Sequence, residues 1–124
     1  MIYLDTHVVV WLYAGLIERF SSTARDLIND NELLISPTVR LELQYLHEIQ
    51  RVLAPPDAII ADLSHRIGLQ VDATDLNTVV TYALTASWTR DPFDRLIVAT
   101  AHVNGRVLVT KDRRLLAHYP HARW

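Results

Sequence analysis

Short apolar runs alternate along the chain with longer stretches in which apolar and polar residues recur at helical spacing. Three-residue runs at 2–4, 33–35 and 107–109, with a weaker one at 69–71, are typical of buried strands, and residues 122–124 are a candidate for a last edge strand. Because amphipathic stretches connect these runs, they predict crossover helices that join parallel strands. The pattern therefore favours an α/β fold whose mostly parallel sheet has four to five strands.

The starts and stops of the helices are marked by residues that cap or break regular structure. Ser21-Ser22 favours a helix start, and Pro37 and Pro92 each occupy the first helical position that proline prefers. The expected helices cover 7–14, 23–29, 37–52, 57–67, the stretch from the Asp75 cap to 86, the stretch from Pro92 to Asn104-Gly105, and a short segment following Asp112. No linker or repeat interrupts them, so we predict one domain over residues 1–124, a three-layer α/β/α sandwich.

Composition narrows the class of protein further. Of the 124 residues, 50% are apolar, 21% are charged and only three are glycine, which excludes a disordered or low-complexity chain. The absence of cysteine excludes disulfides, thiolate zinc sites and cysteine nucleophiles, and it is compatible with a reducing cytosol. The apolar run 8–14 is too short for a membrane span, and no basic segment precedes it. We therefore expect a cytoplasmic protein with no membrane partner.

The distribution of charge carries more information than the net charge of −2. Residues 90–124 hold seven Lys and Arg against three Asp, whereas residues 1–89 hold five basic against eleven acidic side chains. Eleven of the twelve basic residues are Arg, which binds phosphate in a bidentate manner. The balance argues against binding of nucleic acid by bulk electrostatics. A local phosphate-binding surface near the C-terminus and an ordinary solvated surface are both compatible with it.

Two aspartates stand where a parallel α/β sheet places its ligand sites, beyond the carboxyl ends of strands. Asp5 directly follows the first predicted strand, and Asp112 follows the fourth after Thr110-Lys111. Each also precedes a predicted helix, so each could serve only as the N-cap of that helix. Sequence position alone does not separate these two interpretations.

Glu42 is predicted to face the core from the helix that starts at Pro37. At about 100° per residue it projects between the directions of Ile49 and Leu53, inside the apolar stripe that these two form with Leu46. An ionised carboxylate in that position costs several kcal/mol unless it is paired or bound to a metal. A metal site and a buried salt bridge to an arginine are therefore the two interpretations of Glu42.

Asp94 repeats this pattern on the helix that follows Pro92. It points between Val98 and Ala101, on a helix that is apolar over most of its circumference. In the segment 91–94, however, Asp91 could be the N-cap and Asp94 the acidic third residue of a capping box. Capping accounts for Asp91 fully and for Asp94 only in part.

Four such acids, two at strand ends and two on core-facing helices, are explained most simply by one converging cluster. They are Asp5, Glu42, Asp94 and Asp112. Like charges held together repel, so such a cluster needs a cation. With oxygen ligands, no cysteine and no pair of histidines four residues apart, Mg²⁺ or Mn²⁺ is favoured over zinc. A few carboxylates that hold such an ion suit the hydrolysis of a phosphodiester.

Four segments together resemble the PIN-domain family, and in particular its VapC-type toxins from bacterial toxin–antitoxin pairs. They are Leu4-Asp5-Thr6-His7, Glu42 in a mid-chain helix, the block RDPFDRLIVA over residues 90–99, and Leu108-Val109-Thr110-Lys111-Asp112. The resemblance runs essentially from end to end, and the DPFDR block with its downstream T-x-D is its most specific part. It implies a small α/β/α sandwich with a parallel sheet and Mg²⁺- or Mn²⁺-dependent endoribonuclease activity.

The resemblance also implies roles for individual residues. The acidic quartet of the family maps onto catalytic residues Asp5, Glu42, Asp94 and Asp112, of which Asp5, Asp94 and Asp112 would bind the metal. Asp91 is an accessory acid, and Thr6 would orient Asp5 or a water molecule at the metal, unless it only caps the next helix. Relatives often have a bulkier residue before the glutamate, where this chain has Leu41, so Glu48 is the alternative to Glu42.

Basic and aromatic side chains that adjoin the acids in sequence are candidates for contacts with RNA. The basic candidates for phosphate contacts are Arg90, Arg95, Lys111 and Arg113, together with Arg114. Their alternative interpretation is ordinary charge at helix ends. We interpret His7 as a capped or packed imidazole, and Trp11 as a core or interface residue in preference to a platform for base stacking.

The sequence thus predicts a metal-dependent endoribonuclease that cuts single-stranded or loop RNA and is the toxin of a toxin–antitoxin pair. By resemblance, its partners are a small antitoxin whose tail covers the site and a second copy of the chain, in a homodimer or in a heterotetramer or larger complex. Two other interpretations are a catalytically silent module that captures an Arg-rich partner and a phosphatase with an aspartyl nucleophile. The phosphatase needs a second aspartate two residues after Asp5, where this chain has His7.

Overall fold

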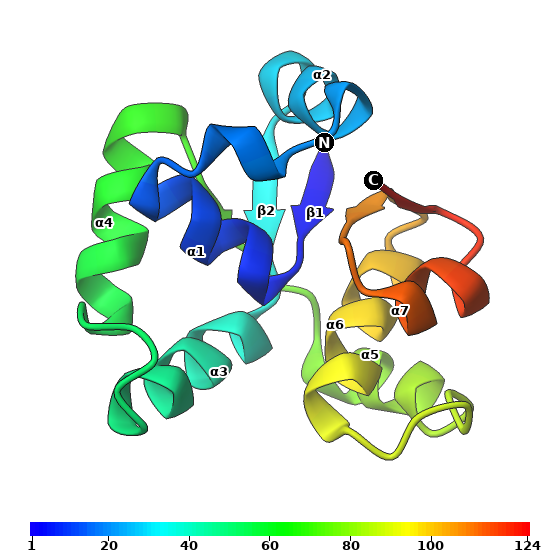
Figure 1. Cartoon of the computed structure of the whole chain (residues 1–124). Helices are drawn as coiled ribbons and strands as arrows, with labels where there is room; N and C mark the ends of the chain where they lie inside the picture. Colours follow the sequence, from blue (N-terminus) through cyan, green and yellow to red (C-terminus); the bar gives the residue numbers. More distant parts are fainter.

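Five short strands form one sheet through the centre of the molecule, and the computed structural model describes all residues from 1 to 124 (Figure 1). The strands are β1 Ile2–Leu4, β2 Leu33–Ile35, β3 Gln70–Val71, β4 Leu108–Val109 and β5 Ala122–Arg123. Every neighbouring pair is parallel, and the strand order is β3-β2-β1-β4-β5. The parallel sheet expected from the sequence is therefore confirmed, with five strands.

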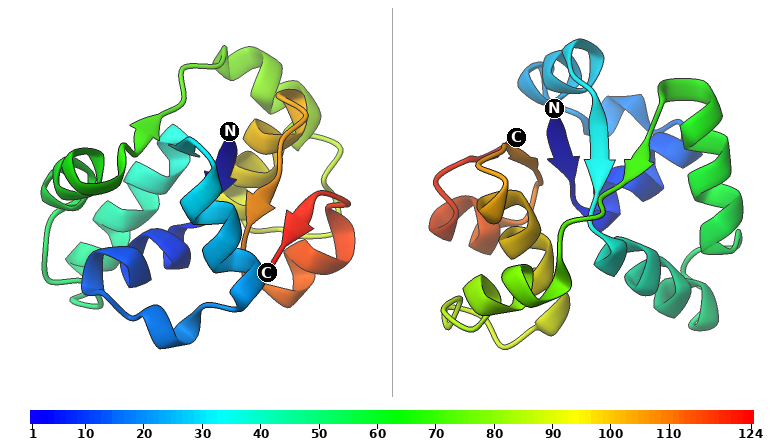
Figure 2. Two further views of the ribbon diagram at one scale, coloured as in Figure 1. Left: turned by 90° about the horizontal axis from the view of Figure 1, so that it is seen from above. Right: turned by 180° about the vertical axis from the view of Figure 1, so that it is seen from behind.

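Seven α-helices and one short 3₁₀ helix connect the strands. They are α1 Thr6–Ala14, η1 Ile17–Arg19, α2 Ser22–Asp30, α3 Pro37–Glu48, α4 Pro56–Ile67, α5 Leu76–Ala83, α6 Pro92–Val103 and α7 Arg113–His118. In Figure 1, α1 and α4 lie on one side of the sheet, α5, α6 and α7 lie on the other, and α3 lies beyond the lower ends of β1 and β2. The view from behind in Figure 2 keeps the same two groups apart. The three-layer α/β/α arrangement is confirmed.

The strand order reverses between β1 and β4. One edge of β1 pairs with β2, where Ile2 lies beside Leu33, and the other edge pairs with β4, where Leu4 lies beside Val109. In open parallel sheets the crevice at such a reversal, beyond the carboxyl ends of the strands, is the usual ligand site. The residues directly after β1 and β4 are therefore the first place to look for chemistry.

The core consists of the strands and the inner faces of the helices packed on them. Leu4, Ile35 and Leu108 are completely buried in the strands, and Leu43 from α3 and Ile97 from α6 pack with them in one cluster. Burial of each such side chain contributes about 1.5–3 kcal/mol to stability. This packing holds the ends of β1 and β4 and the starts of α3 and α6 in a rigid relation.

Helix α3 ends at Glu48, four residues earlier than the apolar pattern predicted. Gln50 adopts a left-handed conformation with φ of 62°, and the amides of Arg51 and Val52 both donate to the carbonyl of Leu46. A left-handed residue turns the chain out of the helix, so this segment folds back over the last turn of α3. Leu53 consequently lies outside the helix and is 88% exposed, which corrects the predicted apolar stripe.

Two further boundaries differ from the expectation by a few residues. Helix α5 ends at Ala83 and not at residue 86, because the amides of Thr85 and Ala86 donate to carbonyls only three residues back and tighten the last turn. Helix α1 begins at Thr6, with Asp5 as its N-cap, so the interpretation of Thr6 as a cap is wrong. No helix combines the length and the apolar content that crossing a membrane requires.

Candidate active site

Asp5 and Asp112 meet at the carboxyl ends of β1 and β4, and Thr110 links them. The hydroxyl of Thr110 donates to Oδ2 of Asp5 over 2.7 Å and accepts from the backbone amide of Asp112 over 3.0 Å. The other carboxylate oxygen of Asp5 accepts from the amide of Thr6 over 2.7 Å. Asp5 is only 5% exposed and Thr110 is completely buried, so this junction is held rigidly.

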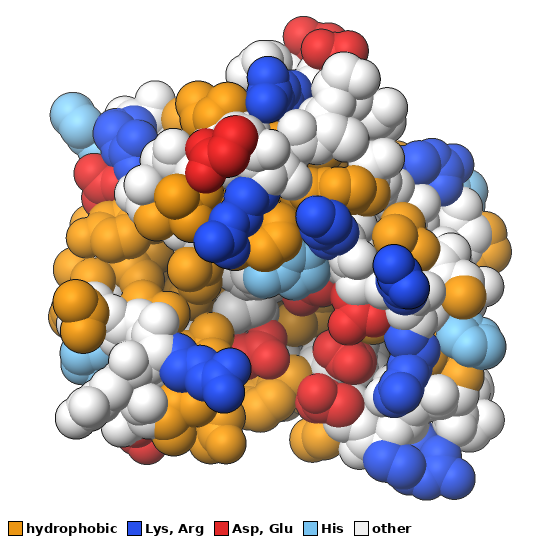
Figure 3. Space-filling view, in the orientation of Figure 1, with side chains coloured by type: hydrophobic (Ala, Val, Ile, Leu, Met, Phe, Trp, Pro, Cys, Tyr) orange, Lys and Arg blue, Asp and Glu red, His pale blue; other side chains and the backbone are white.

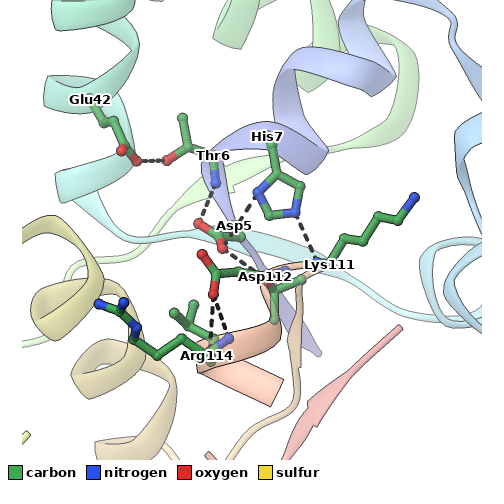
Figure 4. Close-up of polar contacts among 9 residues, drawn as sticks. Asp5, Thr6, His7, Glu42, Lys111, Asp112 and Arg114 are labelled. Carbon is green, nitrogen blue, oxygen red and sulfur yellow. Dashed lines mark hydrogen bonds and ion pairs between the residues drawn. The ribbon is translucent and has the colours of Figure 1, made fainter. Parts of the chain in front are cut away.

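Both aspartates also cap helices, as the alternative interpretation required. Asp5 is the N-cap of α1, and Asp112 is the N-cap of α7, where its Oδ1 accepts from the amides of Arg114 and Leu115. Capping and a role in a site are therefore compatible, because the other oxygen of Asp112 makes no such bond and points toward Asp5 (Figure 4). The cap fixes the direction of each carboxylate.

Glu42 reaches the same junction from α3. Its Oε1 accepts a hydrogen bond from the hydroxyl of Thr6, which joins α3 to the start of α1 (Figure 4). Glu42 forms no ion pair, so the alternative of a buried salt bridge to an arginine is wrong. Its placement does not come from the predicted stripe, since Ile49 is 45% exposed and the buried face of α3 is formed by Val39 and Leu43.

Asp94 lies in the first turn of α6 without a hydrogen-bond partner. Asp91 is the N-cap of this helix and accepts from the amide of Phe93 over 2.8 Å. The amide of Asp91 donates to the hydroxyl of Thr89 over 3.2 Å and not to Asp94, so the capping box suggested by the sequence does not form. Capping therefore explains Asp91 and leaves the half-buried carboxylate of Asp94 unaccounted for.

The acids affect one another electrostatically. Burial, followed by the negative charges of Asp91, Asp5, Asp112 and Glu42, raises the pKa of Asp94 to about 7. Burial also raises the pKa of Glu42, the hydrogen bond from Thr6 opposes that rise, and the charges of Asp5 and Asp91 add to it. Carboxylates from β1, α3, α6 and the β4–α7 junction are thus close enough to resist simultaneous ionisation.

These acids line one cleft with a volume of about 550 Å³. Its acidic lining residues are Asp5, Glu42, Asp91, Asp94 and Asp112. In Figure 3 acidic side chains gather in a hollow of the surface, and basic side chains stand around its rim. The convergence expected for the four acids is therefore seen, while Glu48, the alternative to Glu42, is exposed and bonded to Gln44 outside the cleft.

The basic residues of the cleft wall are not the ones that the sequence suggested. Arg19 from η1 and Arg51 from the segment after α3 line the cleft. By contrast, the guanidinium of Arg95 donates to the carbonyls of Thr89 and Ala83 over 2.9 and 3.4 Å, and that of Arg90 donates to Ser87. No local motif marks Arg19 or Arg51, because neither adjoins any of the four cleft acids in the sequence. Phosphate contacts by Arg90, Arg95, Lys111 and Arg113 stay a prediction.

His7 stands between the cleft and Lys111. Its Nε2 accepts from the backbone amide of Lys111 over 2.9 Å, and its Nδ1 lies 3.6 Å from Oδ2 of Asp5 (Figure 4). The acceptor role of Nε2 assigns the proton to Nδ1, which then faces the carboxylate. The imidazole is thus fixed by the fold, as expected, although it also lines the cleft.

The chemistry of the donor set fits a hard divalent cation. All candidate ligands are carboxylate oxygens, and the pKa of Asp94 is raised first by burial and then by the neighbouring negative charges, whose repulsion a bound cation would relieve. Asp5, Asp94 and Asp112 could hold such an ion, with Glu42 beside them. As they stand, the side chains form no group of three His, Asp or Glu placed to bind one ion, so binding of an ion would require these carboxylates to move.

Comparison with known proteins agrees with this fold and site. Residues 2–121 match the PIN domain. The chain is 36% identical over 118 residues to ribonuclease VapC22 of Mycobacterium tuberculosis, a match that covers 93% of this chain and 89% of that protein. The chain therefore belongs to the PIN-domain family, and the likeness to its VapC-type members that the sequence suggested is confirmed.

Solved structures agree on the fold. VapBC2 from Rickettsia felis, bound to a DNA fragment from its promoter, superposes with a TM-score of 0.68 at 20% identity, covering 98% of this chain and 96% of that one. A toxin–antitoxin complex from Klebsiella pneumoniae gives a TM-score of 0.67 at 14% identity, covering 100% and 97%. At such low identity the likeness concerns the architecture of the chain.

Proposed function

We propose that this protein is a metal-dependent endoribonuclease of the VapC type. The observation that carries the proposal is the meeting of Asp5, Glu42, Asp94 and Asp112 in one cleft, where burial, followed by the charges of its acidic neighbours, raises the pKa of Asp94 to about 7. Buried like charges without basic partners are costly unless a cation is bound. The kinship with a ribonuclease over nearly the whole chain supports the same reaction class.

Asp5, Asp94 and Asp112 are the proposed ligands of Mg²⁺ or Mn²⁺, and Asp91 is an accessory acid at the rim. When bound, such an ion supplies charge stabilisation for the transferred phosphoryl group and makes water more acidic. Thr110 holds Asp5 and Asp112 in place, so their oxygens need little reorganisation. This preorganisation favours the charge that develops in the transition state.

Glu42 is the proposed proton acceptor. Thr6 donates to its Oε1, which leaves Oε2 free to take a proton from the attacking water. Its raised pKa brings it nearer to neutral pH, where a general base works best. Thr6 is accordingly a positioning residue, which orients Glu42 through its hydroxyl and Asp5 through its amide.

RNA with an accessible backbone is the proposed substrate. Arg19 and Arg51 on the cleft wall are suited to phosphates on either side of the cut bond, and Lys111 stands at the rim beside His7. Single strands and loops present such a backbone, whereas a paired helix restricts access to it. Arg90, Arg95 and Arg113 are further candidates for phosphate contacts.

The protein is also proposed to be the toxin of a toxin–antitoxin pair. The support is the likeness to toxins of this kind, together with an apolar hollow of about 270 Å³ between α1, α2 and α4. Trp11 lines both this hollow and the acidic cleft, so an antitoxin seated in the hollow could extend a tail over the acids. A homodimer, or a heterotetramer or larger complex with the antitoxin, belongs to the same proposal. The product of a short reading frame next to this gene should co-purify with the protein and inhibit it.

Single substitutions of the acids test the proposed reaction. Asp5→Asn and Asp94→Asn should each lower the rate of RNA cleavage by at least about 100-fold, because each removes a ligand charge while keeping the shape of the side chain. Cleavage of labelled structured and unstructured RNA is followed with Mg²⁺ or Mn²⁺. Asp26→Asn, an exposed aspartate on α2, is the matched control and should cleave like the unmodified protein.

Two results would contradict the proposal. Full activity in Asp94→Asn would show that this carboxylate, which has no hydrogen-bond partner in the cleft, is not needed for cleavage. Cleavage that EDTA does not affect would exclude a metal-dependent reaction. Absence of cleavage by the unmodified protein under all of these conditions would favour the silent binding module.

A further inference from the structure

An aromatic cluster stands directly beside the acidic cleft. The ring centroid of Trp11 on α1 lies 5.9 Å from that of Trp124, 5.0 Å from that of His7 and 6.1 Å from that of Phe20. Phe20 also lies 5.4 Å from Trp124, which ties the end of the chain to the region after η1. Trp11, His7 and Trp124 are all partly exposed, and we refer to these three as the aromatic platform.

Two cations flank the platform. The guanidinium carbon of Arg19 lies 5.3 Å from the ring centroid of Trp11, and Nζ of Lys111 lies 5.9 Å from both Trp11 and Trp124. At these distances a cation is attracted by the face of an indole ring. Neither Arg19 nor Lys111 forms an ion pair, so both charges are available to a ligand.

Through His7 and Trp11, the platform adjoins the proposed catalytic cleft. A hollow of about 240 Å³ is lined by His7, Trp11, Lys111 and Asp112. His7, Trp11 and Asp112 also line the acidic cleft, together with Arg19. A group bound on the platform would therefore lie next to a phosphate that occupies the acidic cleft.

We propose that the aromatic platform binds an unpaired nucleobase of the RNA, adjacent to the phosphodiester that is cut, while Lys111 and Arg19 hold the flanking phosphates. The inference rests on the proposed ribonuclease function and adds a substrate subsite to it. Aromatic rings interleaved with basic side chains are suited to a single strand, because each base stacks while its phosphate meets a cation. An Arg-rich peptide fits this place less well, since Arg19 and Lys111 would repel it.

The subsite has a consequence for substrate choice. A base held on Trp11 must be unstacked from its neighbours, which a single strand or loop permits at small cost and a paired helix does not. Stacking accepts any base, so the platform would select for single-strandedness more than for sequence. This differs from the interpretation of Trp11 as a core or interface residue that the sequence alone favoured.

Binding measured without cleavage tests the subsite. Fluorescein-labelled single-stranded oligoribonucleotides, intact or with one abasic position, are titrated against protein that carries Asp94→Asn. One abasic position should weaken binding by about tenfold, which corresponds to the loss of one stacked base. Trp11→Leu and Trp124→Ala should weaken binding of the intact strand by a similar factor and abolish the difference between the two strands. Trp11→Phe should retain most of the affinity for the intact strand and most of the difference between the two strands.

Trp88→Leu is the matched control, since Trp88 stacks on His118, whereas Trp124 pairs with Trp11 and His7. It should leave both affinities unchanged. Thermal unfolding identifies any variant that does not fold. Equal binding of intact and abasic strands, or no oligonucleotide binding at all, would overturn the subsite.

Cleavage by the unmodified protein separates this inference from the proposed function. If RNA is cut and the platform variants keep an unchanged KM, only the subsite is wrong. If intact strands bind tenfold better than abasic ones but no condition gives cleavage, the subsite stands and the ribonuclease proposal fails. Preferential binding of an Arg-rich peptide at Trp11, in competition with RNA, would also contradict the subsite.

Discussion

Thr110 is the residue on which the arrangement of two proposed metal ligands depends. It is completely buried, donates to Asp5 and accepts from the amide of Asp112. Its hydroxyl therefore sets the orientation of one carboxylate and the start of the turn that carries the other. In the sequence it stands out only as the first residue of the T-x-D pattern, because a threonine at a strand end has many structural roles.

Thr110→Val should lower the rate of RNA cleavage at least tenfold, because it keeps the shape of the side chain and removes both hydrogen bonds. Loss of a buried hydrogen bond should also cost about 1–3 kcal/mol in stability. Thr100→Val is the matched control: Thr100 is equally buried and donates to Ser36 and to the carbonyl of Leu96, outside the cleft. Kinetics and thermal unfolding of both variants should show similar destabilisation but a loss of activity only at Thr110.

The raised pKa of Asp94 predicts how stability depends on pH in metal-free protein. With a pKa of about 7 when folded and 3.8 in an unperturbed chain, Asp94 retains a proton in the folded state that the unfolded state releases. This contribution favours the folded state fully below about pH 4 and is lost as the pH rises to about 7. The free energy of unfolding should therefore fall over this window, to which Glu42 adds in the same direction.

Asp94→Asn should flatten this pH dependence, because asparagine carries no titrating proton. Urea unfolding between pH 4 and 8 in EDTA measures it, with Asp26→Asn as the control that keeps the slope of the unmodified protein. An unchanged slope in Asp94→Asn would show that the carboxylates are not coupled as the geometry indicates.

At the scale of elements, Glu42 on helix α3 lines the cleft although the pattern that placed it there was partly wrong. The helix was expected to continue to about residue 52, and Glu42 was placed by a stripe that included Leu53. The left-handed Gln50 ends the helix early and leaves Leu53 exposed. Glu42 nevertheless points to the cleft, because Val39 and Leu43 bury the adjacent face of α3.

Glu42→Gln should reduce RNA cleavage by at least about 100-fold, because an amide cannot accept the proton of an attacking water. Glu48→Gln on the same helix should have little effect, since Glu48 is exposed and bonded only to Gln44. Single-turnover cleavage rates for the two variants provide the comparison. A larger loss in Glu48→Gln than in Glu42→Gln would reverse the assignment on α3.

Caps were predictable at this scale because they depend on residues close in sequence. Asp91 before Pro92 and Ser36 before Pro37 both accept from amides of the helices that they start, as their residue types favour. The same local reasoning allowed a capping box at Asp94, which the fold does not contain. Whether an acid in a first turn closes a box or faces a cleft depends on what packs against the helix.

For the molecule as a whole, the strand order β3-β2-β1-β4-β5 places the acids in one crevice. Asp5 follows the central strand β1, Asp112 follows its neighbour β4, and α3 and α6 bring Glu42 and Asp94 to the same end of the sheet. Charges that repel in this crevice are the reason to expect that a divalent cation stabilises the folded state.

Mg²⁺ or Mn²⁺ should raise the Tm of the protein by several degrees at pH 7.5, because an ion that binds only the folded state adds its binding free energy to stability. KCl at equal ionic strength should give a much smaller shift. Asp5→Asn and Asp94→Asn should lose most of the response to the divalent ion, while Asp26→Asn should keep it. Equal shifts in all four proteins would mean that the ion binds elsewhere.

The sequence was sufficient for the α/β class, the parallel sheet and most helix starts, because periodicity, capping and proline placement act between residues near one another in the chain. It also singled out the four acids that line one cleft, whose roles stay a prediction. It did not show that Arg19 and Arg51 line the cleft, that Thr6 donates to Glu42, or that Trp11, His7 and Trp124 adjoin the acids. Most of those relations join residues that lie far apart in the chain, such as Thr6 with Glu42 and Trp11 with Trp124. These contacts form only when the packed core has set the positions of the strand ends and helices. Contacts between residues far apart in the sequence depend on the fold, and not on the spacing of residues along the chain.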